Sequence, residues 1–597
     1  MATAPKQTPS TPALSPRRRR LFLALTLALP WLLLLLLELG LRLGGYGGDY
    51  PLFVPFARQP EYLVPNAEFA RRYFPAGGFL PSPELSFFRA EKRPGAFRIV
   101  FQGESSAQGF PYGHGAAPAR MLEQRLQSTW PGQEIEVVNT ALTAISSYTL
   151  LDQADEIVGQ RPDAVLIYTG HNEYYGALGA GSARSVGEWR PLVRAYLALR
   201  RLRTVQLLER ALGGGGGATP SSDREGARTV MQVMAGEQRI PLGSRRYRIG
   251  LEQFRANLDA LLARYAARGI PVLIGTVASN ERDQPPFDGG PTSADSFYAA
   301  AKALDARGDS ANARDAYRQA KERDALRFRA PEAINEIIRE VAARRGATVV
   351  ETQRALERAS PGGVVGRTLM LEHLHPNVDG YFLIAGAFYE ALRQKQMIGP
   401  WPAPVPAAQA RLEVPVTPVD SAAALLRTDR LTSGWPFRPS GATRTPAVDT
   451  LRPRTPVEQI AQALVRGNIP WLEAMERQRA AFERAGDREG AVRVARAIAQ
   501  EYRYAPEPLM DAARLSIEQR HYGDAARYAR AAAERHETPK SLQLTGLLLL
   551  REGDRAAAMP YLERAARLAP GDQRIVLPLR AAGALPGLER RRASAPR

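Results

Sequence analysis

The hydrophobic positions of this chain fall into three successive patterns. Residues 21–43 form an almost unbroken apolar run, LFLALTLALPWLLLLLLELGLRL. Over residues 96–395, short β-branched runs alternate with helical patterns, and from residue 456 onward the chain is alanine-rich and helical. These patterns predict a membrane-length helix, an α/β domain and an all-α domain, in that order.

The apolar run of residues 21–43 is long enough to cross a bilayer, since at about 1.5 Å per residue its apolar part covers roughly 30 Å. Lys6 and Arg17–Arg20 precede it, while only Arg42 follows closely. This bias predicts a basic cytoplasmic tail over residues 1–20 and export of everything after the helix. The alternative is a cleaved signal peptide, although the run is long for a signal core and no A-x-A site follows it.

The exported part begins with residues 44–95, a lead-in rich in proline, glycine and aromatic residues. Five strand patterns then alternate with helical ones: FRIVFQ (97–102), EIEVVN (134–139), AVLIY (164–168), PVLIGTV (271–277) and ATVVE (347–351). Such alternation predicts a parallel sheet with helices on both faces. Between the strands, the glycine run 213–217 predicts a surface loop, and residues 294–326 predict a helical hairpin that turns at Gly308-Asp309.

Residues 396–455 are rich in proline and are interpreted as a linker or wrapping segment. In residues 456–585, Ala491, Ala525 and Ala558 occupy equivalent places at a spacing of about 34 residues. This period resembles that of tetratricopeptide repeats, with an irregular helical bundle as the alternative. A basic tail, residues 586–597, ends the chain.

Composition narrows the chemistry. The chain contains no cysteine, which excludes disulfides, thiolate metal sites and a cysteine nucleophile. The net charge of +19 fits an arginine-rich solvated surface and leaves attraction to anionic lipid head groups open. Aromatic and basic residues do not interleave as on a nucleic-acid platform, so no nucleic-acid partner is expected.

Polar stretches follow four of the strand patterns: GESSAQG (103–109), NTALTAISS (139–147), GHNEYYG (170–176) and EHLHPN (372–377). In an open parallel sheet these positions converge on the edge where ligands bind. A serine, an imidazole and a carboxylate are the groups that acyl transfer requires. We therefore predict Ser105 as the nucleophile, His375 as its general base and Glu372 as the acid that orients His375. The candidate oxyanion donors are the backbone N–H of Ser105, a backbone N–H near Ala141 and the side-chain amide of Asn172.

In order and spacing, these stretches resemble the conserved blocks of GDSL/SGNH-type serine hydrolases: Gly103-Glu104-Ser105, Ala141, Gly170-His171-Asn172 and Glu372-His373-Leu374-His375-Pro376. The resemblance implies a flavodoxin-like parallel sheet, hydrolysis of an ester or acyl group, and no cofactor. The expected fold is thus α/β and SGNH hydrolase-like over residues 96–395. A C-terminal all-α helical-hairpin domain, TPR-like, follows it, and one N-terminal transmembrane helix precedes it.

The chain departs from the pattern of that family at several positions. Glu372 replaces an aspartate, which adds one methylene of reach. Ala141 replaces a glycine and would be strained if a positive φ were needed there. Glu104 replaces an aspartate that takes no part in the chemistry, and His373 is expected to point away from the triad and shape the pocket.

Three alternatives stay open around these residues. Ser106 is the substitute nucleophile if the register shifts by one. Glu372, His373 and His375 could instead form a metal site, although no second cluster with metal spacing accompanies them. Tyr174 and Tyr175 serve either core packing or substrate contact.

Our predicted function is a membrane-anchored serine esterase that removes acyl groups, O-acetyl groups included, from an envelope glycan or lipid. The predicted location is a bacterial inner membrane, with the N-terminus in the cytoplasm and the catalytic domain in the periplasm. The alternatives are an O-acyltransferase with the same triad and a scaffold with a degenerate hydrolase module. The repeats are expected to bind a protein partner in addition.

Overall fold

The computed structural model describes residues 15–74, 80–130, 133–182, 188–213, 230–235, 239–289, 293–439 and 441–583. Most of the expected glycine-rich loop, the basic tail at 586–597 and the cytoplasmic tail up to residue 14 lie outside these ranges.

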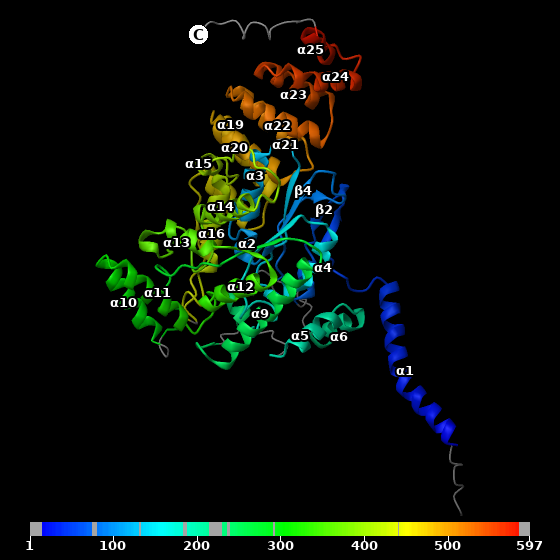
Figure 1. The fold of residues 1–597 in the computed structure, drawn as a ribbon, viewed down its shortest axis with the longest axis vertical. Coiled ribbons are helices and arrows are strands. Elements are labelled where there is room, and N and C mark those ends of the chain that lie inside the picture. Colours follow the sequence, from blue (N-terminus) through cyan, green and yellow to red (C-terminus); the bar gives the residue numbers. More distant parts are fainter. Residues whose placement is uncertain are drawn as a thin grey trace, which may run out of the picture.

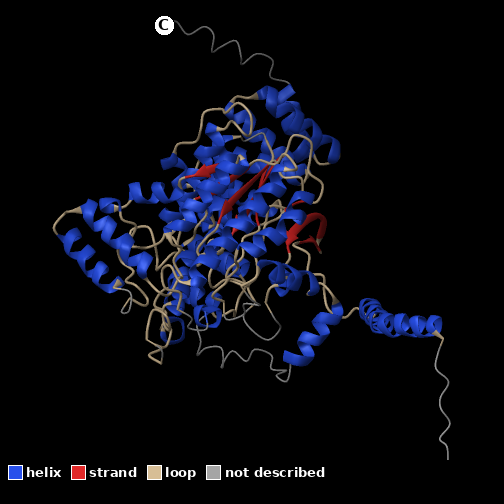
Figure 2. Cartoon of the chain, turned by 60° about the horizontal axis from the view of Figure 1, so that its bottom comes forward, coloured by secondary structure: helices blue, strands red, loops and turns tan. Residues whose placement is uncertain are grey.

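A five-stranded parallel sheet forms the centre of the structure (Figure 1, Figure 2). Its strands lie within the five apolar runs or one residue beyond: β4 (Phe97–Gly103), β5 (Ile135–Asn139), β6 (Ala164–Tyr168), β7 (Val272–Gly275) and β8 (Thr348–Val350). The strand order is β5-β4-β6-β7-β8, and every pair is parallel. Counted from β4, this is the 2-1-3-4-5 order of flavodoxin-like folds, which confirms the predicted fold class.

Two groups of helices pack on this sheet. The first comprises α3 (Pro118–Thr129) and α14 (Val378–Gln394). The second comprises α4 (Ser147–Gly159), α9 (Arg245–Ala266) and α12 (Glu332–Arg345). Further short helices of the domain are α2 (Ser105–Gln108), α5 (Arg190–Leu199), α6 (Arg203–Gly213), α8 (Val230–Ala235) and α13 (Thr352–Ala359).

Two neighbouring residues of β4 show that the helix groups cover opposite faces of the sheet. The ring of Phe101 lies 5.2 Å from that of Phe388 in α14. The next side chain, Gln102, accepts a hydrogen bond of 2.7 Å from Tyr265 in α9. Successive side chains of a strand point to opposite faces, so these two contacts show that helices cover both faces of the sheet. A ligand can therefore reach the strands only at the edge where they end.

The apolar run forms α1 (Pro16–Leu43), which projects from the rest of the chain (Figure 1). Its most apolar 18-residue window has a mean hydropathy of 2.3 and is not buried by the protein. By length and composition, α1 can cross a membrane.

The lead-in contains a small antiparallel sheet that the hydrophobic pattern did not predict. Its strands are β1 (Phe53–Phe56), β2 (Gln59–Pro65) and β3 (Phe88–Arg89), in that order. The ring of Tyr504, from the repeat region, lies 4.9 Å from Phe56 and 4.7 Å from Phe87. The lead-in therefore contacts the C-terminal helices as well as preceding the α/β domain.

The expected hairpin insertion consists of α10 (Ala294–Ala306) and α11 (Ser310–Arg323). Gly308 turns the chain with a φ of 79°, a left-handed value that favours glycine. The side chain of Asp309 caps α11 by accepting a hydrogen bond from the backbone N–H of Asn312. The hairpin projects from the domain in Figure 1.

All regular elements described in the C-terminal part are helices. Within the proline-rich segment lie α15 (Ala407–Leu412), α16 (Pro418–Leu431) and α17 (Ala447–Thr450). The repeat region contains α18 (Pro456–Val465), α19 (Trp471–Arg484), α20 (Arg488–Glu501), α21 (Glu507–Glu518), α22 (Tyr522–Arg535), α23 (Pro539–Glu552), α24 (Arg555–Leu568) and α25 (Gln573–Gly583). Ala491, Ala525 and Ala558 are fully buried near the starts of α20, α22 and α24, the second helices of successive hairpins.

Candidate active site

Ser105 begins α2 directly beyond the end of β4. The strand can turn this tightly because Gly103 has no side chain: a Cβ there would lie 2.2 Å from the carbonyl oxygen of Tyr168. Gly109 ends α2 with a φ of 99°, which glycine tolerates. The turn presents Ser105 at the carboxyl edge of the sheet.

His375 and Glu372 lie in the loop before α14, and they meet Ser105 at that edge. The Nε2 atom of His375 is 2.7 Å from the Oγ atom of Ser105. The Nδ1 atom of His375 is hydrogen-bonded to Oε1 of Glu372, an oxygen that also accepts the backbone N–H of His375 at 3.1 Å. Asn377 caps α14 by accepting the N–H of Gly380 at 3.0 Å. The structure thus brings the three predicted catalytic residues together in a chain of hydrogen bonds.

The surroundings of Glu372 keep its carboxylate charged, as a partner of the His375 imidazole must be. Burial raises the pKa of its carboxyl group, but His373 and His375 lower this pKa by more. The net result is a pKa well below the usual 4.5. The carboxylate therefore stays ionised at neutral pH and accepts the Nδ1–H of His375. This leaves the Nε2 lone pair facing the Ser105 hydroxyl, ready to take its proton.

His373 does not point away from the triad as expected. Its Nδ1 atom is hydrogen-bonded to Oε2 of Glu372, the oxygen that His375 leaves free. Aromatic rings surround it: Phe287 at 5.5 Å and Phe437 at 5.3 Å. Burial lowers the pKa of His373, so its imidazole is a neutral donor that fixes the carboxylate from the other side. The triplet His-x-His after a glutamate was the only sequence signal for this arrangement.

Glu372, His373 and His375 also lie close enough to hold a metal ion, with one ligand atom of each within 4.8 Å of the others. The atoms that would bind it already pair with one another, because both Nδ1 atoms contact the oxygens of Glu372. Metal binding would replace the Glu372–His375 hydrogen bond, so the two interpretations compete for the same atoms.

The three candidate oxyanion donors differ in what they already bind. As the first residue of α2, Ser105 has a backbone N–H without a partner inside the helix. The N–H of Ala141 donates to the side chain of Asn139 at 3.0 Å, so a substrate oxygen would compete with that acceptor. The backbone of Ala141 does not adopt a positive φ, so alanine causes no strain there.

Asn172 is held through its backbone, whose N–H donates to Oε2 of Glu104 at 3.1 Å. Its side-chain amide forms no hydrogen bond among the residues that the structure describes, and the residue is half-buried. The amide is thus free to bind a substrate oxygen.

Glu104 has a structural role that the sequence analysis missed. Its buried carboxylate accepts hydrogen bonds from the Thr169 hydroxyl at 2.7 Å and from the N–H groups of Gly170, His171 and Asn172 at 3.0, 3.0 and 3.1 Å. Burial raises the pKa of this carboxyl to about 7, although the donors oppose the shift. Glu104 thereby fixes the Asn172 loop relative to Ser105, its neighbour in the sequence.

Glu173, the residue after Asn172, also holds two loops together. It accepts the Ser147 N–H at 3.0 Å and the Ser147 hydroxyl at 2.9 Å, and burial raises its pKa to about 8. The stretches after β5 and β6 are therefore tied together. Tyr174 and Tyr175 are both fully buried and contact Tyr247 and Phe328, as core residues do.

The catalytic side chains are largely buried. Ser105 is 5% exposed and His375 is 6% exposed. The ring of Phe110 lies 4.6 Å from that of His375 on one side, and Phe437 of the proline-rich segment covers His373 on the other. A cavity of about 240 Å³ is bordered by Phe110, the ring that contacts His375, and by Gln108 and Arg427, among others.

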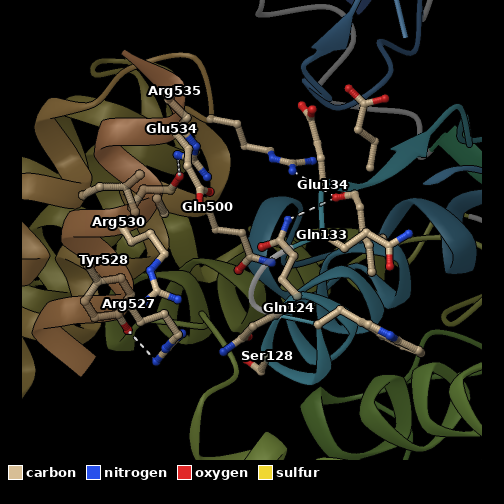
Figure 3. A pocket seen from close by; sticks show the side chains of 18 of the residues that line it. Gln124, Ser128, Gln133, Glu134, Gln500, Arg527, Tyr528, Arg530, Glu534 and Arg535 are labelled. Atoms are coloured by element: carbon tan, nitrogen blue, oxygen red, sulfur yellow. Dashed lines mark hydrogen bonds between the residues drawn. The ribbon is translucent and has the colours of Figure 1, made fainter. Parts of the chain in front are cut away.

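A larger groove, of about 630 Å³, lies elsewhere, between the repeat helices and the β5 edge of the domain (Figure 3). Arg527, Arg530 and Arg535 line the side formed by α22, and Gln124 and Glu134 line the opposite side. Ser105, Glu372 and His375 do not line it. Its size therefore does not make it the site of acyl chemistry.

Residues 101–383, a range that contains all five predicted site residues, match the model of the GDSL-like lipase/acylhydrolase family. Residues 539–572 match a tetratricopeptide repeat, which covers α23 and α24. No curated protein matches the chain. Among solved structures, the chain is similar to the lipase/acylhydrolase from Enterococcus faecalis, with 15% identity, coverage of 50% of this chain and 96% of that one, and a TM-score of 0.26. It is also similar to a GDSL-like lipase from Bacteroides thetaiotaomicron VPI-5482, with 11% identity, coverage of 50% and 88%, and a TM-score of 0.25.

Residues 101–383 therefore form a domain of the GDSL-like lipase/acylhydrolase family, a family of hydrolases that act on acyl esters. The chain couples this domain to an N-terminal apolar helix and to a C-terminal tetratricopeptide repeat, as the sequence predicted.

Proposed function

We propose that the chain is a membrane-anchored, extracytoplasmic serine esterase that removes acyl groups, O-acetyl groups included, from an envelope glycan or lipid. The observation that carries the proposal is the hydrogen-bonded series from Glu372 through His375 to Ser105, with 2.7 Å between Nε2 and Oγ.

The catalytic steps follow from this geometry. The Ser105 oxygen attacks the ester carbonyl while Nε2 of His375 takes the hydroxyl proton, and Glu372 stabilises the resulting imidazolium. The N–H of Ser105 and the Asn172 amide stabilise the oxyanion, with Ala141 as the third candidate donor. His375 then protonates the leaving alcohol. Water, activated by His375, finally hydrolyses the acyl-Ser105 ester and releases the acid.

Labelling of the full-length protein with a fluorophosphonate probe tests the triad. We expect the probe on Ser105, and we expect His375→Ala to remove the label. Ser106→Ala is the matched control, because Ser106 is adjacent and buried but its Oγ makes no hydrogen bond in the described structure. Label on Ser106, or labelling that survives His375→Ala, would refute the assignment. No label on any serine would favour a scaffold with a degenerate hydrolase module.

A second candidate function is acyl transfer to a sugar hydroxyl, and the burial of Ser105 and His375 favours it. A closed site excludes water, so that an acceptor alcohol can compete for the acyl-enzyme. Product analysis with an aryl acetate, with and without an oligosaccharide acceptor, separates the two functions. An acetylated acceptor supports transfer, and free acetate alone supports hydrolysis.

The anchor and its orientation belong to the same proposal: a single span in a bacterial inner membrane, with the basic N-terminus in the cytoplasm. Arg17–Arg20, in the first turns of α1, support this orientation. A protease-protection assay on spheroplasts tests it, since the hydrolase domain should be digested from outside. A mature chain that begins after α1 would instead indicate a cleaved signal sequence.

A further inference from the structure

Two helices of the hydrolase domain expose large apolar side chains close to the end of α1. They are α5, with exposed Leu192 (46%) and Leu199 (51%), and α6, with exposed Leu208 (55%); Trp189 (68%) and Leu202 (38%) directly precede α5 and α6. Single exposed leucines are common on soluble proteins, but several on two adjoining helices point to a surface that binds something apolar.

The apolar stripe of α5 is separate from the face that packs on the domain. Leu192, Ala195 and Leu199 are spaced by three and four residues, so they lie on one side of the helix. Val193, which is fully buried, lies on the side that contacts the domain. Folding therefore does not account for the exposed leucines. Arg194 and Arg210 are also exposed, but each is two residues from an exposed leucine and therefore lies on another side of its helix.

Hydrogen bonds fix α6 to the end of α1. The carboxylate of Glu38 in α1 accepts the N–H groups of Arg203 and Thr204 at 3.1 and 2.8 Å, and so caps the first turn of α6. Beyond α1, both backbone groups of Gly48 bond the side chain of Gln206 at 3.0 and 3.1 Å. In Figure 1, α5 and α6 lie on the side of the domain from which α1 projects.

The position of Glu38 along α1 defines the level of α6 relative to a bilayer. Glu38 follows Arg20 by 18 residues, a helical rise of about 27 Å, which is close to the roughly 30 Å of a hydrocarbon core. When Arg20 lies at one boundary of the core, Glu38 and the start of α6 lie at the other. The start of α6 and the adjoining end of α5 are then level with the lipid head groups.

We propose that the face of α5 and α6 formed by Trp189, Leu192, Leu199 and Leu208 lies in the lipid interface and holds the hydrolase domain against the bilayer. The occupant is the membrane that contains α1, and the inference rests on the anchor of the proposed function. Amphipathic helices of this kind insert their apolar face at the boundary between head groups and acyl chains. The domain is therefore oriented on the membrane rather than tethered loosely to it.

Depth measurements on spin-labelled full-length protein test the inference, and the absence of cysteine allows single labels. The variants are Leu33→Cys in α1, Leu199→Cys and Leu208→Cys on the proposed face, and Leu412→Cys in α15 as the matched control. Leu412 is an exposed leucine (82%), and α15 lies far from α1 in Figure 1. Each protein is reconstituted into vesicles of phosphatidylglycerol and phosphatidylcholine. Collision rates with oxygen and with a water-soluble nickel chelate then give the depth of each label.

We expect the labels at 199 and 208 to lie roughly 5–10 Å inside the head-group boundary, the label at 33 deeper, and the label at 412 in water. If the label at 33 is deep but either label on the proposed face is as accessible to nickel as that at 412, the inference is wrong and the anchor stands. If the label at 33 is also in water, the anchor and the inference both fail, while labelling of Ser105 still decides the triad.

Discussion

Three buried glutamates lie at the same edge of the central sheet, and the pKa of one is shifted in the opposite direction to those of the other two. Around the loop after β6, burial raises the pKa of Glu104 to about 7 and that of Glu173 to about 8. Before α14, burial acts on Glu372 in the same direction, but two imidazoles hold its pKa well below 4.5. The difference lies in the donors rather than in the degree of burial.

The donors also separate two roles. Glu104 and Glu173 bind backbone N–H groups and hydroxyls, and they position loops around the site. Glu372 binds imidazoles, which keep it charged and which it orients in turn. Glu104 and Glu173, among neutral donors, thus hold loops in place, whereas in the proposed mechanism Glu372, between two histidines, assists proton transfer.

The largest expected effect comes from removing the charge of Glu372 while keeping its shape. In Glu372→Gln the imidazolium of His375 loses its counter-charge, so kcat for an aryl acetate should fall about 10³–10⁴-fold. The matched variant is Glu104→Gln, which should lose about tenfold because it acts only on loop position. Steady-state kinetics with circular dichroism as a folding control measure both. Equal losses in the two variants would refute the division of roles.

The next largest effect is a pH-dependent contribution of the Glu104 carboxyl to the free energy of unfolding. Because the folded pKa of Glu104 is raised from 4.5 to about 7, the folded state binds more protons than the unfolded state between these values. Its stabilising contribution is full below pH 4.5 and is lost as the pH rises through about 7, on the order of 3 kcal/mol in total.

Urea unfolding at pH 4.5 and pH 9 measures this loss. The decline in the free energy of unfolding should be smaller in Glu104→Gln by that amount. Glu173 contributes to both proteins and cancels. An identical decline in both proteins would show that the Glu104 carboxyl is ionised throughout the range.

A smaller effect is expected at His373. His373→Phe removes the donor to Oε2 of Glu372, and hydrogen bonds to charged groups are worth about 1.5–3 kcal/mol, so kcat should fall about 10–100-fold with little change in KM. His373→Gln keeps a donor and should restore most of the activity. If the phenylalanine variant retains full activity, His373 serves packing among Phe287 and Phe437 instead.

The smallest effect is expected at Ala141. Since its φ is not positive, Ala141→Gly should change kcat by less than about twofold and lower the free energy of unfolding by at most about 1 kcal/mol. The same kinetic and urea measurements apply. A tenfold gain in kcat would instead mean that the oxyanion hole needs a backbone conformation that alanine hinders.

Sequence alone determined the order of strands and helices in the domain, because alternation of buried β-branched runs with helical periods is a local property. It also placed Ser105, Asn172 and His375 beyond strand ends or before the last helix, and parallel strands bring such positions to one edge. The 34-residue spacing of Ala491 and Ala525 likewise indicated the repeats before their burial was seen.

Tertiary structure alone decided what those residues contact. Glu104 binds N–H groups more than 60 positions away, Glu38 caps a helix about 165 positions away, and the lead-in strands pack on Tyr504. His373 turned toward Glu372 rather than away from it. Local periodicity carries no information about such pairs, since they form only when the fold brings distant segments together and each buried polar group must find a partner there.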